Sequence, residues 1–79
     1  MYFVYRLQSK NLPNQIYTGF TNDVDKRLQF HNNGQVPHTN KYKPWELLNY
    51  FAFTDRKKAL TFEKYLKSGS GRAFSAKHF

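Results

Sequence analysis

The stretch IYTGFTNDVDKRLQFHNNG, residues 16–34, predicts the end of a strand, a turn and one amphipathic helix. Thr21 or Asn22 is expected to cap the helix, because their side chains accept hydrogen bonds from free backbone N–H groups. Asp23 and Asp25 then fall in the first turn, where the helix dipole favours carboxylates. A strand that leads directly into an amphipathic helix indicates a domain in which helices pack on a sheet.

The inward stripe of this helix contains two residues that break the apolar pattern. On a helical wheel, Val24, Arg27, Leu28 and His31 fall within one arc of about 100°. The ordinary structural interpretation is an arginine that reaches water from the edge of the stripe, beside a packed core histidine. The functional interpretation is a polar site beneath the helix, which Gly34 is expected to end.

A hairpin is expected before this helix. Residues 2–8 alternate aromatic and β-branched side chains, and SKNLPN supplies turn residues ahead of the strand QIYTGF. A turn centred near Asn11 places Tyr5 opposite Tyr17, which is an ordinary stabilising pair on a sheet. Gly19 follows at the end of the strand, where a residue without a side chain allows close approach of backbone or ligand.

A third strand and a second helix are expected after a polar basic loop. The aromatic and apolar residues 45–53 predict a strand, which we place at the centre of the sheet. Thr54 and Asp55 are expected to cap a helix over residues 55–68, and Gly69 is expected to end it.

The order of the predicted elements indicates the fold class. Residues 71–79 predict a short third helix, so the chain reads β-β-α-β-α-(α). Because an antiparallel hairpin comes first, this order predicts an α+β domain with helices packed on a small sheet. No repeat, low-complexity segment or linker divides residues 1–79, which we expect to form one domain.

The composition indicates a basic protein with an aromatic core. Thirteen Lys and Arg against five Asp and Glu give a formal charge of +8, spread along the chain. The expected partner is a polyanion, nucleic acid ahead of an anionic membrane surface, because no long basic amphipathic helix supports the latter. Charge alone does not distinguish such a protein from one that is merely basic. The absence of cysteine and of any apolar run near the roughly 20 residues of a membrane span favours a cytoplasmic protein.

The second predicted helix carries a carboxylate on its apolar face. Glu63 shares one arc with three apolar side chains, and a buried carboxylate needs a partner. A salt bridge to Lys67, four residues later, or to Arg27 across the interior is the structural interpretation. The functional alternative is a divalent metal ion, since one carboxylate suffices for Mg²⁺ when water and substrate phosphate complete the octahedron. A two-metal site lacks its ligands, because three of the five acidic residues belong to helix starts.

Taken together, these residues resemble the GIY-YIG endonuclease domain. FVY at 3–5 and YTG at 17–19 are separated by eleven residues, and Arg27, His31 and Glu63 follow in order. HNNG, KYKPWELLNYFAF and EKYLKSGSGR extend the resemblance to small stand-alone bacterial GIY-YIG proteins, over nearly the whole chain. FVY replaces GIY and YTG replaces YIG, but both tyrosines and the second glycine are kept. SGSGR stands where some relatives, including the incision subunit of nucleotide excision repair, have an asparagine.

The resemblance implies a three-stranded antiparallel sheet flanked by helices, and hydrolysis of a DNA phosphodiester with one Mg²⁺ or Mn²⁺ ion per site. It implies that Glu63 is the metal ligand and Arg27 the phosphate clamp. It further implies that Tyr5 activates water or relays its proton, that Tyr17 supplies a second hydroxyl, and that His31 hydrogen-bonds to the tyrosines. Family members differ in the group that takes the proton.

A basic track is expected to bind the phosphate backbone. Its predicted members are His38, Lys41, Tyr42 and Lys43 of the loop, and Lys64, Lys67 and Arg72 of the second helix and beyond. Tyr42 is expected to stack on an unpaired base. Each residue alone reads equally as a solvated surface group. No helix presents several side chains for reading bases, so cleavage of branched or damaged DNA, in repair or recombination, is favoured over sequence recognition.

Two other functions stay open from the sequence. The chain could be a non-catalytic nucleic-acid-binding module of the same fold, which awaits a partner or a separate DNA-binding domain. It could also be directed at RNA, because the basic surface suits RNA as well as DNA.

Overall fold

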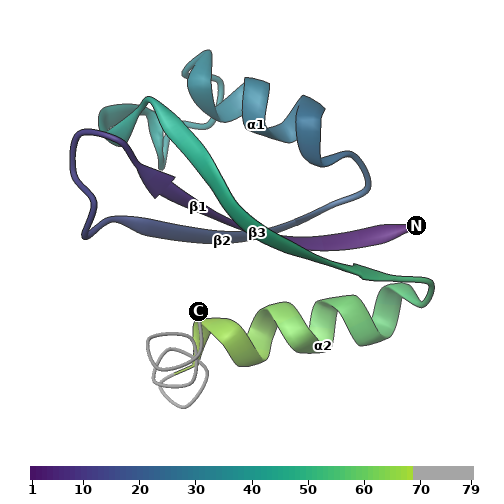
Figure 1. Cartoon of the computed structure of the whole chain (residues 1–79). Helices are drawn as coiled ribbons and strands as arrows, with labels where there is room; N and C mark the ends of the chain where they lie inside the picture. The colour runs from purple at the N-terminus through teal and green to yellow at the C-terminus, as the bar shows by residue number, and fades with distance from the viewer. Residues whose placement is uncertain (69–79) are drawn as a thin grey trace.

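The computed structural model describes residues 1–68 as a three-stranded antiparallel sheet with one helix on each face (Figure 1). The elements are β1 (Tyr2–Ser9), β2 (Ile16–Thr21), α1 (Val24–Asn32), the short 3₁₀ helix η1 (Asn40–Tyr42), β3 (Trp45–Phe53) and α2 (Arg56–Lys67). The predicted α+β class and the order of these elements are confirmed. The third helix expected over 71–79 and the stop expected at Gly69 lie outside the described residues.

β1 is the central strand, because the strand order is β2-β1-β3 with antiparallel neighbours. The prediction that residues 45–53 form the central strand was wrong. Burial explains the arrangement, since β1 is buried at four consecutive positions from Val4 to Leu7, whereas exposure alternates along β3. A strand covered on both faces suits the centre of a sheet, and an alternating strand suits its edge.

The register of the β1–β2 hairpin differs from the expected one by two residues. Gly19 lies opposite Tyr5, and Tyr17 lies opposite Leu7, so the connection centres on Leu12 and not on Asn11. Residues two apart share one face of a strand, so Tyr5 and Tyr17 are still diagonal neighbours. Their ring centroids are 6.2 Å apart.

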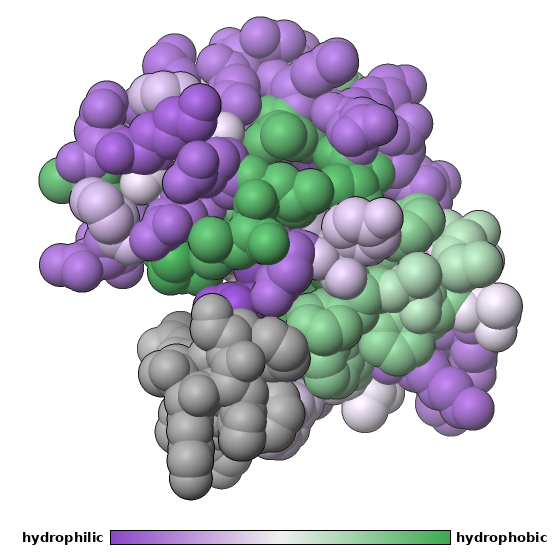
Figure 2. All heavy atoms as spheres, viewed as in Figure 1, coloured by the Kyte–Doolittle hydropathy of each residue, from purple (hydrophilic) through white to green (hydrophobic). Residues whose placement is uncertain are grey.

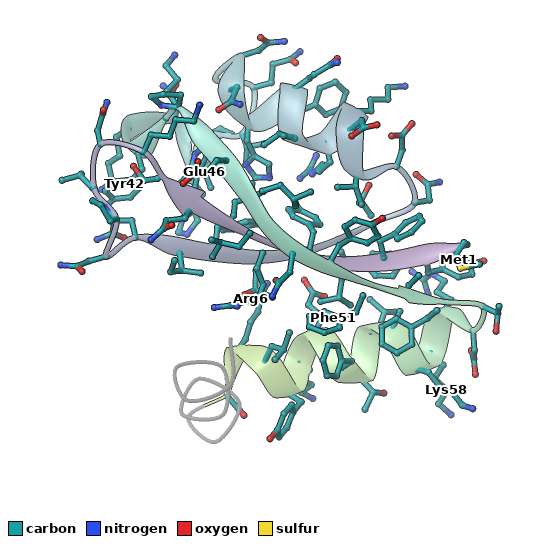
Figure 3. The ribbon with its side chains drawn as sticks, viewed as in Figure 1. Met1, Arg6, Tyr42, Glu46, Phe51 and Lys58 are labelled. Carbon is teal, nitrogen blue, oxygen red and sulfur yellow. The ribbon has the colours of Figure 1, made fainter. Side chains whose placement is uncertain are left out.

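The core is divided in two by the alternation of side chains along β1. The cluster on the α2 side contains Val4, Ala59 and Leu66, with Phe51, Phe53 and Phe62 packed against it. The other cluster contains Tyr5, Leu7 and Trp45, with Tyr17, Leu28 and Leu47 packed against it. Figure 3 shows Phe51 between the sheet and α2. The two helices therefore cover opposite faces, and the tyrosines lie on the face opposite α2.

An aspartate is the N-cap of each helix. The carboxylate of Asp23 accepts a hydrogen bond from the Lys26 N–H at 3.1 Å, so Asp23 is the N-cap of α1 and the prediction of Thr21 or Asn22 was wrong. The Thr21 hydroxyl oxygen instead accepts from the Asp23 N–H, which holds the chain just before the helix. Asp55 caps α2 as one of the two expected residues. 

The end of α1 is also the predicted one. The helix stops at Asn32, and Gly34 follows with φ +75°, a conformation that favours glycine.

The surface is mainly polar around an apolar band. Figure 2 shows hydrophilic side chains over α1 and the neighbouring loops, with apolar side chains across the middle of this face. Among residues 1–68, no helix is both long and apolar enough to cross a membrane.

Candidate active site

Tyr5 lies directly over the backbone of Gly19. The two residues pair across β1 and β2, and a Cβ atom placed on Gly19 would collide with the Tyr5 hydroxyl and ring. Gly19 itself is buried. Because Gly19 has no side chain, the Tyr5 ring can lie against the backbone of the edge strand β2. This is the close approach that the sequence predicts at Gly19.

A buried hydrogen bond joins Tyr5 to α1. The Tyr5 hydroxyl is 2.9 Å from Nε2 of His31, and both side chains are almost fully buried, at 1% and 0% exposure. The ring of Tyr17 lies beside that of His31, with centroids 4.9 Å apart. His31 faces inward because it lies on the buried stripe of α1, one turn beyond Arg27. The two tyrosines and the histidine therefore form one contact group.

Arg27 and Glu63 act on this group electrostatically. Burial raises the pKa of Tyr5 to about 12, while a hydrogen-bonding interaction with Arg27 lowers it and the charge of Glu63 raises it. Burial, followed by the charge of Arg27, lowers the pKa of His31 to about 4. α1 and α2 cover opposite faces, yet residues from both reach Tyr5. At neutral pH the hydrogen bond joins an uncharged phenol and an uncharged imidazole.

Glu63 already has a cationic neighbour. Its side chain is 18% exposed, and Oε2 lies 3.1 Å from Nζ of Lys67. The Lys67 ammonium is also 5.7 Å from the ring centroid of Tyr17, so this ion pair sits beside the tyrosines. Of the two partners that the sequence allows for Glu63, Lys67 is the one observed. No salt bridge joins Glu63 to Arg27 within residues 1–68.

The donor set suits one hard cation at most. Within residues 1–68 no three His, Cys, Asp or Glu side chains gather as a metal-binding cluster. Glu63 offers a single carboxylate that already attracts a positive charge. This fits Mg²⁺, which commonly binds through one or two carboxylates and keeps water or phosphate oxygens as its other ligands.

The predicted phosphate-binding residues are distributed over two surfaces. His38 is exposed on the loop before η1, and its ring centroid is 6.3 Å from that of Tyr17, at the rim of the site. Lys41, Lys43 and Lys64 are exposed. Arg72 lies outside the described residues.

Tyr42 differs from the other predicted members of the track. It is half-buried, its ring packs edge to face on Trp45 with centroids 6.3 Å apart, and Nζ of Lys41 lies 5.1 Å from its centroid. Much of the ring surface is therefore in contact with the protein itself, and stacking on a base stays a prediction.

Thr39 is a member of the site that the sequence did not reveal. It is 1% exposed, and its Oγ1 is 2.7 Å from Nδ1 of His31. It lies in a polar basic loop without periodicity, eight residues after His31, so no spacing rule relates the two. A threonine in such a loop reads as a turn residue.

A protein-family model and the sequences of known proteins match this chain over most of its length. A model of the GIY-YIG catalytic domain family matches residues 1–76. The UPF0213 protein CPE1444 of Clostridium perfringens is 35% identical over 68 residues, which are 85% of this chain and 71% of that protein. The UPF0213 protein YazA of Bacillus subtilis is 34% identical over 67 residues, which are 84% of this chain and 66% of YazA.

A solved structure agrees with the fold. The solution NMR structure of the UPF0213 protein BH0048 from Bacillus halodurans matches with a TM-score of 0.57 and 30% sequence identity. The match covers 98% of this chain and 84% of that one.

Proposed function

The chain belongs to the GIY-YIG catalytic domain family, a family of nucleases, and we propose that it is a metal-dependent DNA endonuclease. The observation that carries the proposal is the buried Tyr5–His31 hydrogen bond, on which Arg27 of α1 and Glu63 of α2 both act. A purely structural tyrosine–histidine pair has no need of a cation and an anion arranged around it.

Arg27 holds the scissile phosphate in this proposal. Its side chain is half-buried on the inward side of α1 and close enough to lower the pKa of His31. A planar guanidinium can donate two parallel hydrogen bonds to phosphate oxygens, which fixes the phosphorus relative to the attacking water. The chain's formal charge of +8 adds a general attraction for the nucleic-acid backbone.

Tyr5 and His31 move the proton of the attacking water. A free tyrosinate is not accessible at neutral pH, because burial raises the pKa of Tyr5 to about 12. A proton relay avoids the tyrosinate. The Tyr5 oxygen accepts a proton from water while the proton of the Tyr5 hydroxyl passes to Nε2 of His31. A bound phosphate offsets the positive charge of Arg27 and so makes His31 a better proton acceptor than it is in the free protein.

Glu63 would hold the Mg²⁺ or Mn²⁺ ion, one per site. When bound, the ion supplies positive charge for the oxygen that leaves the phosphorus. Lys67 must release Glu63 for this ligand role, and its ammonium is then free for a neighbouring phosphate.

The exposed basic side chains support the proposed class of substrate. The exposed basic residues His38, Lys41, Lys43 and Lys64 suit contacts with phosphates, which carry no sequence information. We therefore propose cleavage governed by DNA structure, such as a branch, nick or lesion, with weak sequence preference. RNA is the alternative polyanion. We also propose that residues 1–79 form one domain. The proposed cellular role is DNA repair or recombination.

A second candidate is a nucleic-acid-binding module without turnover. The Glu63–Lys67 ion pair favours this module, because Lys67 already balances the charge of Glu63. The pair therefore needs no metal ion. The intact Tyr5–His31 pair favours the nuclease.

Cleavage assays distinguish the two. Purified protein is incubated with single-stranded, duplex, flap and junction DNA and the matching RNAs, with Mg²⁺, Mn²⁺ or EDTA. Glu63→Ala and Tyr5→Phe are expected to lose cleavage but keep binding, whereas Glu46→Ala, which removes an exposed glutamate of β3, retains both (Figure 3). Binding without cleavage in every condition supports the module, and cleavage by Glu63→Ala contradicts its ligand role.

A further inference from the structure

Thr39 is built into the interior from three sides. Its N–H donates to the Val36 carbonyl at 3.1 Å, and its own carbonyl accepts from Nε1 of Trp45 at 3.1 Å. Trp45 is itself anchored to α1, because Nδ2 of Asn32 donates to the Trp45 carbonyl and the Trp45 N–H donates to Oδ1 of Asn32. These bonds hold the backbone of Thr39 in place, and its side chain lies next to His31.

The hydroxyl of Thr39 lies between two possible partners. Oγ1 is 2.7 Å from Nδ1 of His31 and 3.3 Å from the Val36 carbonyl oxygen. Both contacts are within hydrogen-bond distance, and a carbonyl oxygen can only accept, so the two bonds form together only when the Thr39 hydroxyl donates its single proton to Val36. The oxygen of Thr39 is then an acceptor for Nδ1–H of His31.

This order of donors determines the state of the other ring nitrogen. A neutral imidazole carries one proton, so a proton on Nδ1 leaves Nε2 as an acceptor. The atom 2.9 Å from Nε2 is the Tyr5 hydroxyl oxygen, which must therefore donate. The hydrogen bonds run in one direction, from Tyr5 through His31 and Thr39 to the Val36 carbonyl.

We propose that Thr39 is a positioning residue that holds His31 in the Nδ1–H tautomer, so that Nε2 is ready to take the proton of Tyr5. The proposal rests on the proposed nuclease function for its consequence in catalysis, but the tautomer is a property of the protein alone. The reverse tautomer would donate from Nε2 to Tyr5 and would leave no acceptor for the Tyr5 proton on His31.

Nitrogen NMR of the imidazole ring tests the assignment directly. Long-range ¹H–¹⁵N spectra of the full chain near neutral pH separate protonated from unprotonated ring nitrogens. The His31 signals are identified by comparison with His38→Gln and His78→Gln variants, because the chain has three histidines. We expect Nδ1 of His31 to be protonated and Nε2 to be bare. The opposite pattern in the wild-type protein overturns the proposal whether or not the protein cuts DNA.

Two substitutions separate the hydroxyl from the shape of the side chain. Thr39→Val keeps the shape and removes the acceptor, so His31 is expected to change to the Nε2–H tautomer or to a mixture. Thr39→Ser keeps the acceptor and is expected to retain the wild-type pattern. An unchanged Nδ1–H tautomer in folded Thr39→Val also overturns the proposal. If Thr39→Val does not fold, Thr39→Ala, which also lacks the hydroxyl, takes its place with the same expected change of tautomer.

Kinetics then connect the tautomer to the reaction. If the protein is a nuclease, Thr39→Val is expected to lower kcat by roughly 10²-fold with little change in KM, and Thr39→Ser to restore most of it. Equal kcat values in Thr39→Val and wild type, with the tautomer changed, would contradict the catalytic consequence and leave the nuclease assignment intact. Absence of cleavage in the wild type would contradict the proposed function and leave the tautomer assignment intact.

Discussion

The hydroxyl of Tyr5 and Nε2 of His31 are 2.9 Å apart inside the protein, which joins the central strand to α1 through two ionisable side chains. Both groups are uncharged near neutral pH, because burial raises the pKa of the phenol and lowers that of the imidazole.

Gly19→Ala tests the close approach of Tyr5. The added methyl group would collide with the Tyr5 ring, which cannot move freely because its hydroxyl is bound to His31. We expect a loss of about 1–3 kcal/mol in the free energy of unfolding, the usual range for overpacking. Urea unfolding measures it, with Thr18→Ala as the control on the opposite face of β2. Equal stability of Gly19→Ala and wild type would mean that the ring has room to shift.

The low pKa of His31 predicts that the protein is less stable in acid. Its pKa in the folded protein is about 4, below the reference value of 6.5. Between these values the unfolded chain binds a proton that the folded protein does not, so stability falls as pH falls from 6.5 to 4. The loss reaches at most about 3 kcal/mol, at 1.36 kcal/mol per pKa unit. Urea unfolding at several pH values checks this.

Variants assign that pH dependence to one histidine. His31→Gln is expected to flatten the slope between pH 6.5 and 4, while His38→Gln, at an exposed position, keeps it. The same slope in His31→Gln as in wild type would assign the acid sensitivity to other groups.

Lys67→Ala tests the proposed competition between Lys67 and a metal ion for Glu63. Removal of the ammonium leaves the carboxylate free, so Mn²⁺ affinity is expected to rise roughly two- to fivefold, as for a partly exposed ion pair. Isothermal titration measures it. Lys64→Ala removes a charge from α2 without breaking the pair and should raise affinity much less. Weaker Mn²⁺ binding by Lys67→Ala would show that the lysine does not compete.

Local patterns predicted most of the fold, but not the arrangement of the strands. Helices and strands follow from periodicity and caps, which act over a few residues. The sequence does not indicate that β1 is central, because Arg6 and Gln8 give it the pattern of an amphipathic strand. In the structure, however, Arg6 is buried. β3 in turn is rich in aromatic residues, yet every second side chain along it is more exposed. Strand order depends on burial on both faces, which one strand's pattern does not encode.

The candidate site could be predicted from the sequence only where its residues break such patterns. His31 and Glu63 stand out because they occupy apolar stripes, and each has a polar partner in the structure. The partner of Glu63 stayed undecided between two cations, since both are within reach of a flexible side chain. Thr39 breaks no pattern, because a threonine in a loop needs no partner to explain it.

Arg27 offers a test that separates its charge from its shape. Its positive charge contributes to the low pKa of His31, so Arg27→Gln is expected to raise that pKa above about 4, whereas Arg27→Lys keeps the charge and most of the effect. Titration of the His31 ring by NMR measures both, with Lys26→Gln, at an exposed position of α1, as the matched charge loss. Both Arg27 variants are nevertheless expected to cleave DNA roughly 10²-fold more slowly, because lysine lacks the planar fork that orients the phosphate. A His31 pKa that rises as much in Lys26→Gln as in Arg27→Gln would indicate a general effect of net charge and not a specific contact.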